Sequence, residues 1–182
     1  ISFFLFIAVF AEQIAPYDPT DMMQGYLPPS KEHILGTNDL GQDIFSEMIY
    51  GTRVSLYIGI FAAFVVTGIG TVMAMISGYF GGIADKIITA VTNIAMAVPS
   101  LPLTVLLVAY LKPGKASLII AISITAWTGT ARILRSRVQQ LCEMPFIKIE
   151  KTMGVHPIII LWKHLLPNMK DLIFTRGALA VS

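Results

Sequence analysis

The chain has 182 residues, of which 55% are hydrophobic and 13% are charged, and its mean hydropathy is +0.72. Soluble domains carry about 25% charged residues, so this composition excludes an ordinary water-soluble domain, whose surface needs more polar groups. The single cysteine, Cys142, excludes an intrachain disulfide framework. The three histidines lack the spacing of three or four residues that a metal site on one helix face requires, so we expect no metal site.

Apolar stretches of membrane-spanning length follow one another along the chain. Residues 54–77 and 87–111 contain no charged side chain over 24 and 25 residues, and about 20 helical residues cross a hydrocarbon core of about 30 Å. Residues 116–131 form a shorter apolar run that ends at Arg132, a side chain that can reach the membrane surface from within a span. We therefore predict three complete membrane-spanning helices in this part of the chain.

Both ends of the sequence are also apolar. Residues 1–15 begin with ISFFLFIAVF, which is too short to span a membrane by itself and which we interpret as a truncated first transmembrane helix. A further apolar stretch begins at Leu172 and contains Arg176. The sequence thus predicts an all-α, polytopic transmembrane helical bundle with at least five helices, and we expect a fragment that lacks its C-terminal helix or helices.

Charge is distributed unevenly between two polar segments. Residues 12–50 contain seven acidic side chains and one lysine, whereas residues 132–170 contain seven lysines and arginines. Cytoplasmic segments of membrane proteins are enriched in Lys and Arg. We therefore predict that residues 16–52 are extracytoplasmic and that residues 132–170 are cytoplasmic, which agrees with the three crossings between them.

Small residues recur at the spacing of one helix face in the first complete span. Gly70, Ala74 and Gly78 are separated by four residues each. Small side chains at this spacing let two helices approach closely in lipid, where packing drives association. We interpret the pattern as a structural helix–helix contact.

The stretch 146–168 is amphipathic and too charged to cross a membrane. Pro145 suits the first turn of a helix, Gly154 suits a left-handed C-terminal cap, and Pro157 can open a second helix. We expect a short helix, a glycine hinge and a second helix that together form a compact knob below the bilayer. By itself the pattern also fits a connector that lies on the membrane surface.

The extracytoplasmic segment contains a turn sequence followed by an apolar helix face. Asn38 or Asp39 is expected to cap a helix from about Leu40 to Tyr50. The segment fits a loop that closes the outer mouth of the bundle, and Asp39 and Asp43 are candidates for docking a protein outside the membrane or for direct contact with a small molecule.

The span 87–111 contains two prolines that are expected to kink it, Pro99 and Pro102. Four residues of this span are candidates for lining a transport pathway, and hydrogen bonding between helices is the alternative for the polar ones. The four candidates are Asn93, Pro99, Ser100 and Thr104.

One G-x-x-x-x-G sequence, from Gly36 to Gly41, continues with Gln42 and Asp43 instead of Lys and Ser or Thr. It is therefore not a phosphate-binding loop. We therefore expect no ATP site in this chain, and we assign no catalytic residue to it.

Four sequence blocks stand out in order along the chain. They are HILGTNDLGQDIFSEMIYGTRVSL (33–56), GYFGGIADKII (78–88), AVPSLPL (97–103) and WTGTARILRSRV (127–138). Together with Gly154 and HLLP at 164–167, they resemble the dipeptide, oligopeptide and nickel permease family of binding-protein-dependent ABC importers, and more specifically its C-type partner. The family usually has Glu-Ala-Ala beginning six residues before this glycine, where Lys148, Ile149 and Glu150 stand here.

The resemblance implies that residues 53–182 form the permease transmembrane domain and that residues 139–170 form a cytoplasmic loop that couples it to an ATPase. It assigns the coupling contacts to one short stretch around the glycine. The residues are Phe146, Ile149, Glu150, Met153, Gly154, Val155, His156 and Pro157.

The resemblance also implies the partners of the chain. They are a homologous permease subunit, two ABC ATPase subunits that bind ATP and Mg, an extracytoplasmic solute-binding protein and the lipid bilayer, with no nucleic acid. The chain itself would be a multi-pass transport subunit of the bacterial or archaeal cytoplasmic (inner) membrane, without a cofactor and without enzymatic activity. Its implied function is uptake of di- and oligopeptides, and the alternative within the family is nickel or a metal chelate.

Two other classes of membrane protein are disfavoured by the residues within the spans. An intramembrane protease needs paired aspartates or a Ser–His set, and an ion-driven secondary transporter favours charged residues at mid-membrane. Residues 54–77 and 87–111 contain neither pattern.

Overall fold

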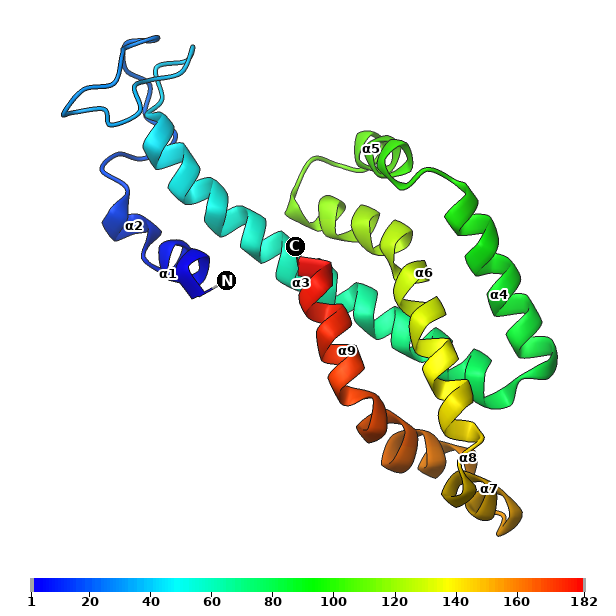
Figure 1. Ribbon diagram of the computed structural model, residues 1–182. Coiled ribbons are helices and arrows are strands. Elements are labelled where there is room, and N and C mark those ends of the chain that lie inside the picture. The colour runs from blue at the N-terminus through cyan, green and yellow to red at the C-terminus, as the bar shows by residue number, and fades with distance from the viewer. Residues whose placement is uncertain (1, 182) are drawn as a thin grey trace. The chain divides into compact units, whose positions relative to one another are not determined.

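The computed structural model describes residues 2–181, which are mostly helical (Figure 1). The chain forms two compact units, residues 1–58 and 59–182, and the long helix α3 (Ile44–Phe80) contributes to both. Within the described residues the only β structure is one isolated bridge between Thr37 and Asp43. The predicted all-α class is confirmed.

The N-terminal unit consists of two short helices, a long loop and the beginning of α3. The short helices are α1 (Ser2–Val9) and α2 (Ala11–Ile14). The loop folds on itself around Thr37, whose hydroxyl donates to the Gln24 carbonyl at 2.7 Å and accepts from the Leu27 amide at 2.9 Å. These bonds give an irregular segment a fixed shape.

Asp43 fixes the start of α3. One carboxylate oxygen accepts from the Ser46 amide and hydroxyl, each at 2.9 Å, and the other lies 3.0 Å from Nδ1 of His33. The predicted helix start near Leu40 and the predicted caps, Asn38 and Asp39, are therefore wrong. Asn38 instead closes the preceding turn, where its side-chain oxygen accepts from the Leu40 and Gln42 amides.

The docking candidates of this segment differ in exposure. Asp39 is exposed, whereas Asp43 is 1% exposed and its carboxylate is occupied within the loop. The docking role predicted for Asp43 is thus contradicted, because a buried carboxylate offers no surface to another protein. Burial disfavours its charged form, but hydrogen bonds from Ser46 and His33 outweigh this and lower the pKa of Asp43 below its ordinary value.

The C-terminal unit contains the rest of α3 and the remaining helices. They are α4 (Gly82–Ala97), α5 (Ser100–Tyr110), α6 (Lys115–Cys142), α7 (Pro145–Thr152), α8 (Pro157–Ile159), the π-helix η1 (Ile160–Leu165) and α9 (Leu166–Val181). Helix α6 lies at the centre of this unit and packs against α4, α5 and α9 (Figure 1).

By length and composition, α3 and α6 can each cross a membrane. Helices α4 and α5 qualify only as a pair, which is bent by 87° between them. Among the described residues, the 8 residues of α1 and the 16 of α9 fall short of the roughly 20 that a span needs.

The prediction of one kinked helix over 87–111 is wrong. Pro99 disfavours a helical conformation at the preceding residue, and Val98 is extended with ψ 128°. Pro99 itself precedes the first residue of α5. Pro102 lies in the first turn of α5, where the missing amide hydrogen breaks no helical hydrogen bond. Two prolines three residues apart therefore produce a full break with a second helix after it.

The predicted small-residue face of α3 packs against α6. A Cβ atom on Gly70 would lie 2.8 Å from Cβ of Thr130, and one on Gly78 would lie 2.7 Å from Cβ of Val138. Ala74, between them, is fully buried. The two helices approach so closely because these positions lack large side chains.

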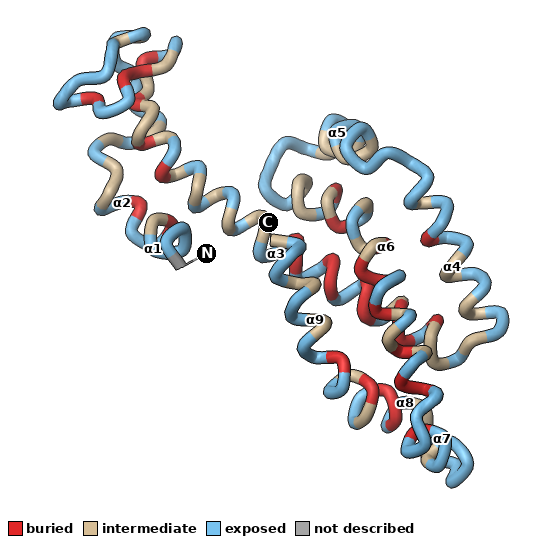
Figure 2. The backbone as a smooth tube through the Cα atoms, in the orientation of Figure 1, coloured by how far each residue is buried: buried red, intermediate tan, exposed pale blue. Residues whose placement is uncertain are grey.

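A hydrophobic core lies where α3, α6, η1 and α9 meet, at the end of the unit that carries α7 (Figure 2). Leu134 and Val138 of α6, Ile147 of α7 and Leu165 of η1 are all 0% exposed. Each fully buried aliphatic side chain stabilises the fold by about 1.5–3 kcal/mol. The short helix α7 is thereby fixed to the long helices.

Substituting Gly70 by leucine is expected to lower the free energy of unfolding by roughly 2 kcal/mol, since overpacking a close helix contact typically costs about 1–3 kcal/mol. Gly68→Leu is the matched control, because a Cβ atom there would have no neighbour within 4 Å. Unfolding in detergent can be followed with a thiol-reactive dye, since the only cysteine, Cys142, is buried. Equal stability of the two variants would contradict this helix contact.

Asp43→Ala is expected to disorder the outer loop, whereas Asp39→Ala leaves it intact. Because the pKa of Asp43 is below that of an unfolded aspartate, about 3.9, its stabilisation is complete near neutral pH and is lost as the pH falls through the folded-state pKa. Limited proteolysis of residues 16–43 between pH 7 and pH 3 measures both effects. The same cleavage rate in wild type and Asp43→Ala at pH 7 would refute the role given to this carboxylate.

Candidate functional site

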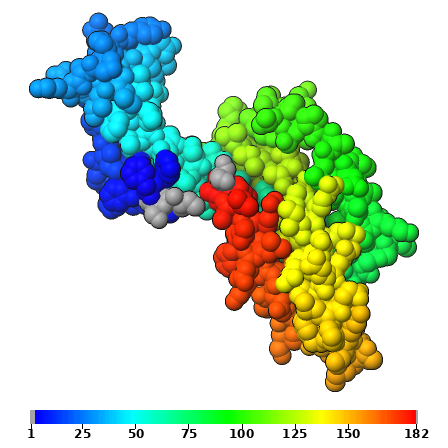
Figure 3. All heavy atoms as spheres, in the orientation of Figure 1, coloured from blue at the N-terminus to red at the C-terminus, as the bar shows by residue number. Residues whose placement is uncertain are grey.

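The segment that carries the predicted coupling residues is a helical hairpin, formed by residues 145–165 of α7, the turn at Gly154, α8 and η1. It forms one end of the C-terminal unit, beyond α6 and α9 (Figure 3). Pro145 is the first residue of α7, as expected, and Pro157 is the first of α8. The predicted knob of two helices around a glycine is confirmed as a structure.

The turn between the two helices depends on Gly154. Its φ is +76°, in the left-handed region that favours glycine. The Val155 amide donates to the Glu150 carbonyl at 3.1 Å, and the Gly154 amide donates to the Lys151 carbonyl at 3.2 Å. This pair of bonds is the Schellman arrangement that ends a helix at a glycine.

Helix α7 has one buried and one exposed apolar face. Ile147 is fully buried, whereas Phe146, Ile149 and Met153 are 40%, 58% and 76% exposed. Exposed apolar side chains grouped on one face are typical of a surface that contacts another protein. We call Phe146, Ile149 and Met153 the outer face of the hairpin.

Two other predicted coupling residues, Val155 and His156, make contacts within the hairpin and its core. Val155 packs against the hydrophobic core, so it contributes little to the outer face. Nδ1 of His156 accepts from the Ile158 amide at 3.3 Å and caps α8. These positions hold the second helix against the first.

Glu150 joins the two arms of the hairpin. Its Oε1 lies 2.9 Å from Nε2 of His164 on η1, and both side chains are about three-quarters buried. Its other oxygen, Oε2, is buried without a hydrogen-bond partner. Glu150 therefore points into the hairpin, and the sequence did not predict its pairing with His164.

Lys148 stands where the family usually has glutamate. It is exposed, and its Nζ lies 2.7 Å from Oε2 of Glu143, which follows the end of α6. The hydrogen bond and charge of Lys148 lower the pKa of Glu143. The ion pair lies in water and contributes little to stability, so the exchanged residue leaves the hairpin fold intact.

The second arm contains a π-helical turn that the sequence did not predict. Residues 160–165 adopt it, and Pro167 follows two residues after its end. Proline removes the amide hydrogen that would continue the regular α-helical pattern, and π turns are frequent at functional sites.

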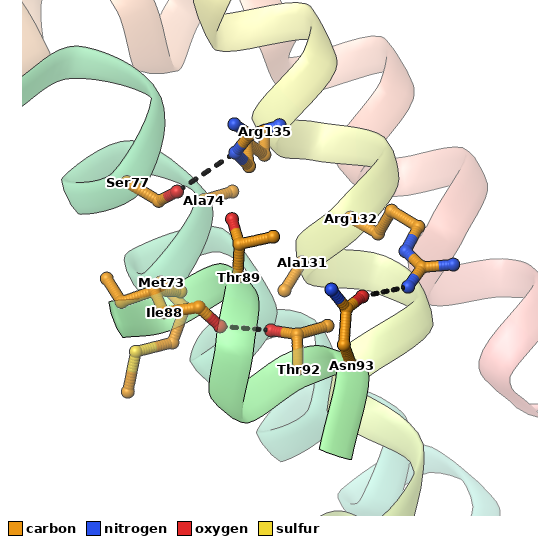
Figure 4. A pocket seen from close by; sticks show the side chains of 10 residues that line it. All are labelled: Met73, Ala74, Ser77, Ile88, Thr89, Thr92, Asn93, Ala131, Arg132 and Arg135. Atoms are coloured by element: carbon orange, nitrogen blue, oxygen red, sulfur yellow. Dashed lines mark hydrogen bonds between the residues drawn. The ribbon is translucent and has the colours of Figure 1, made fainter. Parts of the chain in front are cut away.

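A polar cluster ties α3, α4 and α6 together. Nε and Nη2 of Arg135 each lie 2.5 Å from the carboxylate of Asp85, and the Ser77 hydroxyl donates to the same carboxylate. Arg135 also donates to Ser77 at 3.1 Å (Figure 4). Such a bidentate arginine–carboxylate pair fixes both distance and orientation. Asp85 and Arg135 come from two of the four sequence blocks. Their opposite charges beside two spans could have indicated this contact, which was not predicted.

Two of the four pathway candidates bind α6. Oδ1 of Asn93 accepts from Nη2 of Arg132 at 2.6 Å (Figure 4), and Oγ1 of Thr104 lies 3.2 Å from Oγ1 of Thr125. Asn93 is on α4, whereas Ser100 and Thr104 are on α5, so they do not share one helix face. The alternative left open by the sequence, hydrogen bonding between helices, describes Asn93 and Thr104.

A small cavity of about 70 Å³ lies between α3, α4 and α6 and includes Asn93 and Arg135 in its lining (Figure 4). It has room for a few water molecules and is far smaller than the roughly 300–1,000 Å³ of small-molecule sites. We therefore assign it to helix packing.

Comparisons with known proteins place the chain in a family. The family of binding-protein-dependent transport system inner membrane components matches residues 70–182. The chain belongs to this family. It is consequently a membrane protein and a component of a transport system, and the resemblance seen in its sequence blocks is confirmed.

Individual permeases are similar over nearly the whole chain. The oligopeptide transport system permease protein OppC of Bacillus subtilis is 38% identical over 97% of this chain and 59% of its own length. The dipeptide transport system permease protein DppC of the same organism is 34% identical over 100% of this chain and 58% of its own length. The glutathione transport system permease protein GsiD of Pectobacterium atrosepticum is 34% identical over 89% and 55%. The chain thus spans less than two thirds of the length of these permeases.

Removing either partner of the Glu150–His164 pair is expected to destabilise the hairpin by about 1 kcal/mol, as for a partly buried charged hydrogen bond. The double variant Glu150→Ala/His164→Ala should cost clearly less than the sum of the single variants, because they remove one shared interaction. Thermal unfolding of the four proteins in detergent gives this coupling free energy. Strictly additive effects would show that the 2.9 Å contact contributes nothing.

Proposed function

We propose that this chain is the permease subunit of an ABC importer that moves di- and oligopeptides across the bacterial or archaeal cytoplasmic membrane. The observation that carries the proposal is the outer face of the hairpin. It presents Phe146, Ile149 and Met153 to the surroundings on a helix whose opposite side is buried in the core of the permease.

In this proposal the outer face of the hairpin docks into a groove on a cytoplasmic ATPase. The hairpin transmits force because Ile147 and Leu165 belong to the same buried cluster as Leu134 and Val138 of α6. Closure of the ATPases around ATP then moves a packed body, and the difference in ATP binding energy between open and closed states drives the transition.

The partners follow from this arrangement. Two ABC ATPase subunits would bind ATP and Mg, a homologous permease subunit would complete the transmembrane pathway, and a solute-binding protein would deliver the substrate from outside. This chain would bind no cofactor, and its part in transport would be mechanical. The predicted orientation, with residues 132–170 in the cytoplasm, places the hairpin on the side of the ATPases.

Peptides are the substrate class that the related proteins favour. OppC, DppC and GsiD are named for oligopeptides, dipeptides and glutathione, and glutathione is itself a short peptide. We propose that the solute-binding protein selects among peptides and that this chain provides part of a less selective path.

The outer loop is our proposed docking surface for the solute-binding protein. Asp39 is exposed there, and Tyr26, Ile34 and Leu40 are 80%, 54% and 56% exposed on the same compact loop. The hydrogen bonds around Thr37 and Asp43 keep this loop in one shape, so a partner would bind it at little entropic cost.

For the transport pathway we propose the break between α4 and α5 at Pro99 and Ser100. Irregular backbone at membrane depth is tolerated where it lines a water-filled cavity or is buried in protein. Both residues are exposed in this chain. The pair α4–α5 would thus border the path, while Asn93 and Thr104 hold it to α6.

Gly154→Val is expected to reduce ATP-driven peptide uptake about tenfold or more in proteoliposomes that contain the complete transporter, and to uncouple ATPase activity from substrate. A Cβ atom at Gly154 would meet nothing within 4 Å, so the effect comes from the positive φ, which costs roughly 1–3 kcal/mol for a β-branched residue. Gly154→Asn is the control, because asparagine tolerates this conformation, and it should retain most of the uptake. If Gly154→Val takes up peptide at the wild-type rate, the coupling role of the hairpin is refuted.

A further inference from the structure

One arginine within the apolar part of α9, Arg176, makes no ion pair with any residue that the structure describes. Arg176 lies where α9 packs against α6, since a Cβ atom on Gly129 would be 3.8 Å from Nη2 of Arg176. The next residue of α9, Gly177, lies against α3, because a Cβ atom there would be 3.6 Å from Oγ1 of Thr67. Arg176 therefore lies at a junction of α3, α6 and α9, with its guanidinium beside Gly129.

This junction lies near the middle of the membrane. Thr67 is 13 residues after Val54 and 10 residues before Ser77, the two ends of the uncharged run of α3. At 1.5 Å per residue these separations are about 20 Å and 15 Å, within a hydrocarbon core of about 30 Å. A charged side chain at this depth costs about 2.5–3.5 kcal/mol on insertion scales and normally faces a water-filled cavity or a partner.

Polar atoms at the junction are left without partners. Nε of Arg176 and Oγ1 of Thr67 are both buried and make no hydrogen bond within the part of the chain that the structure describes. The Asp85 carboxylate, on α4, is already paired with Arg135. Arg176 thus has no acidic partner among the described residues.

We propose that Arg176, together with Thr67, forms a binding site for the C-terminal carboxylate of the transported peptide. A guanidinium binds a carboxylate through two parallel hydrogen bonds, and the Thr67 hydroxyl can donate a further one. Every linear peptide ends in this group whatever its side chains, so such a site accepts peptides of varied sequence. The assignment rests on the proposed function, because it requires that peptides pass through this chain.

The test compares a peptide with its C-terminal amide. The complete transporter with its solute-binding protein is reconstituted in proteoliposomes, and the uptake KM is measured for tri-alanine and tri-alanine amide. The variants are Arg176→Gln, Arg176→Lys and, as a matched control outside the junction, Arg137→Gln. The binding protein is the same in every reaction, so a change in the acid-to-amide ratio between variants arises in the permease.

Arg176→Gln is expected to raise KM for the free acid roughly tenfold or more, as for a lost charged hydrogen bond, and to leave KM for the amide unchanged. Arg176→Lys should be intermediate and Arg137→Gln should match wild type. An unchanged acid-to-amide ratio in Arg176→Gln would overturn the site while leaving peptide import intact. If the Arg176→Gln variant loses the second permease subunit during purification, the proposal is overturned in favour of an ion pair between Arg176 and a carboxylate on that subunit. Absence of any peptide uptake by wild type would overturn the proposed function as well.

Discussion

Burial of the hairpin's inner side against the long helices is the interaction on which the rest of this structure depends. Ile147, Ile160 and Leu165 are fully buried, and they share one core with Leu134 and Val138 of α6. Protein cores are close-packed and deform little. A displacement of α7 therefore moves α6, instead of bending a flexible connection. Without this contact the hairpin would be attached only through its chain connections, and a force on the exposed face of α7 would not move the long helices.

Close helix contacts and polar contacts also fix α3 and α4 rigidly to α6. Gly70 and Gly78 bring α3 within reach of α6, and Asp85 and Arg135 clamp α4 onto the same helix. Near the hairpin, Glu150 and His164 hold its two arms together. Helix α6 is thus the element through which motion of the hairpin reaches the others in this unit.

Much of this fold could be predicted because its signals are local. Uncharged length identifies α3 and α6, and Pro145, Gly154 and Pro157 each favour one backbone conformation that the structure adopts. The rest depends on contacts that sequence spacing does not contain. The pairing of Glu150 with His164 requires that the hairpin first close, and the burial of Asp43 requires that His33 fold back onto it. The predicted kink at Pro99 is a full break in the structure, because two prolines three residues apart favour the start of a new helix.

The most direct measurement of the central claim is site-specific cross-linking to the ATPase. In a Cys142→Ser background the chain has no cysteine, so a single cysteine can be introduced at Ile149 on the outer face of the hairpin or, as a control, at Tyr110, which is 86% exposed at the end of α5. The account predicts that Ile149→Cys cross-links to the ATPase subunit in membranes and that Tyr110→Cys does not. The absence of a cross-link from Ile149→Cys would contradict the coupling role of the hairpin. Labelling of Ile149→Cys by a membrane-impermeant reagent from outside intact cells would contradict its cytoplasmic position.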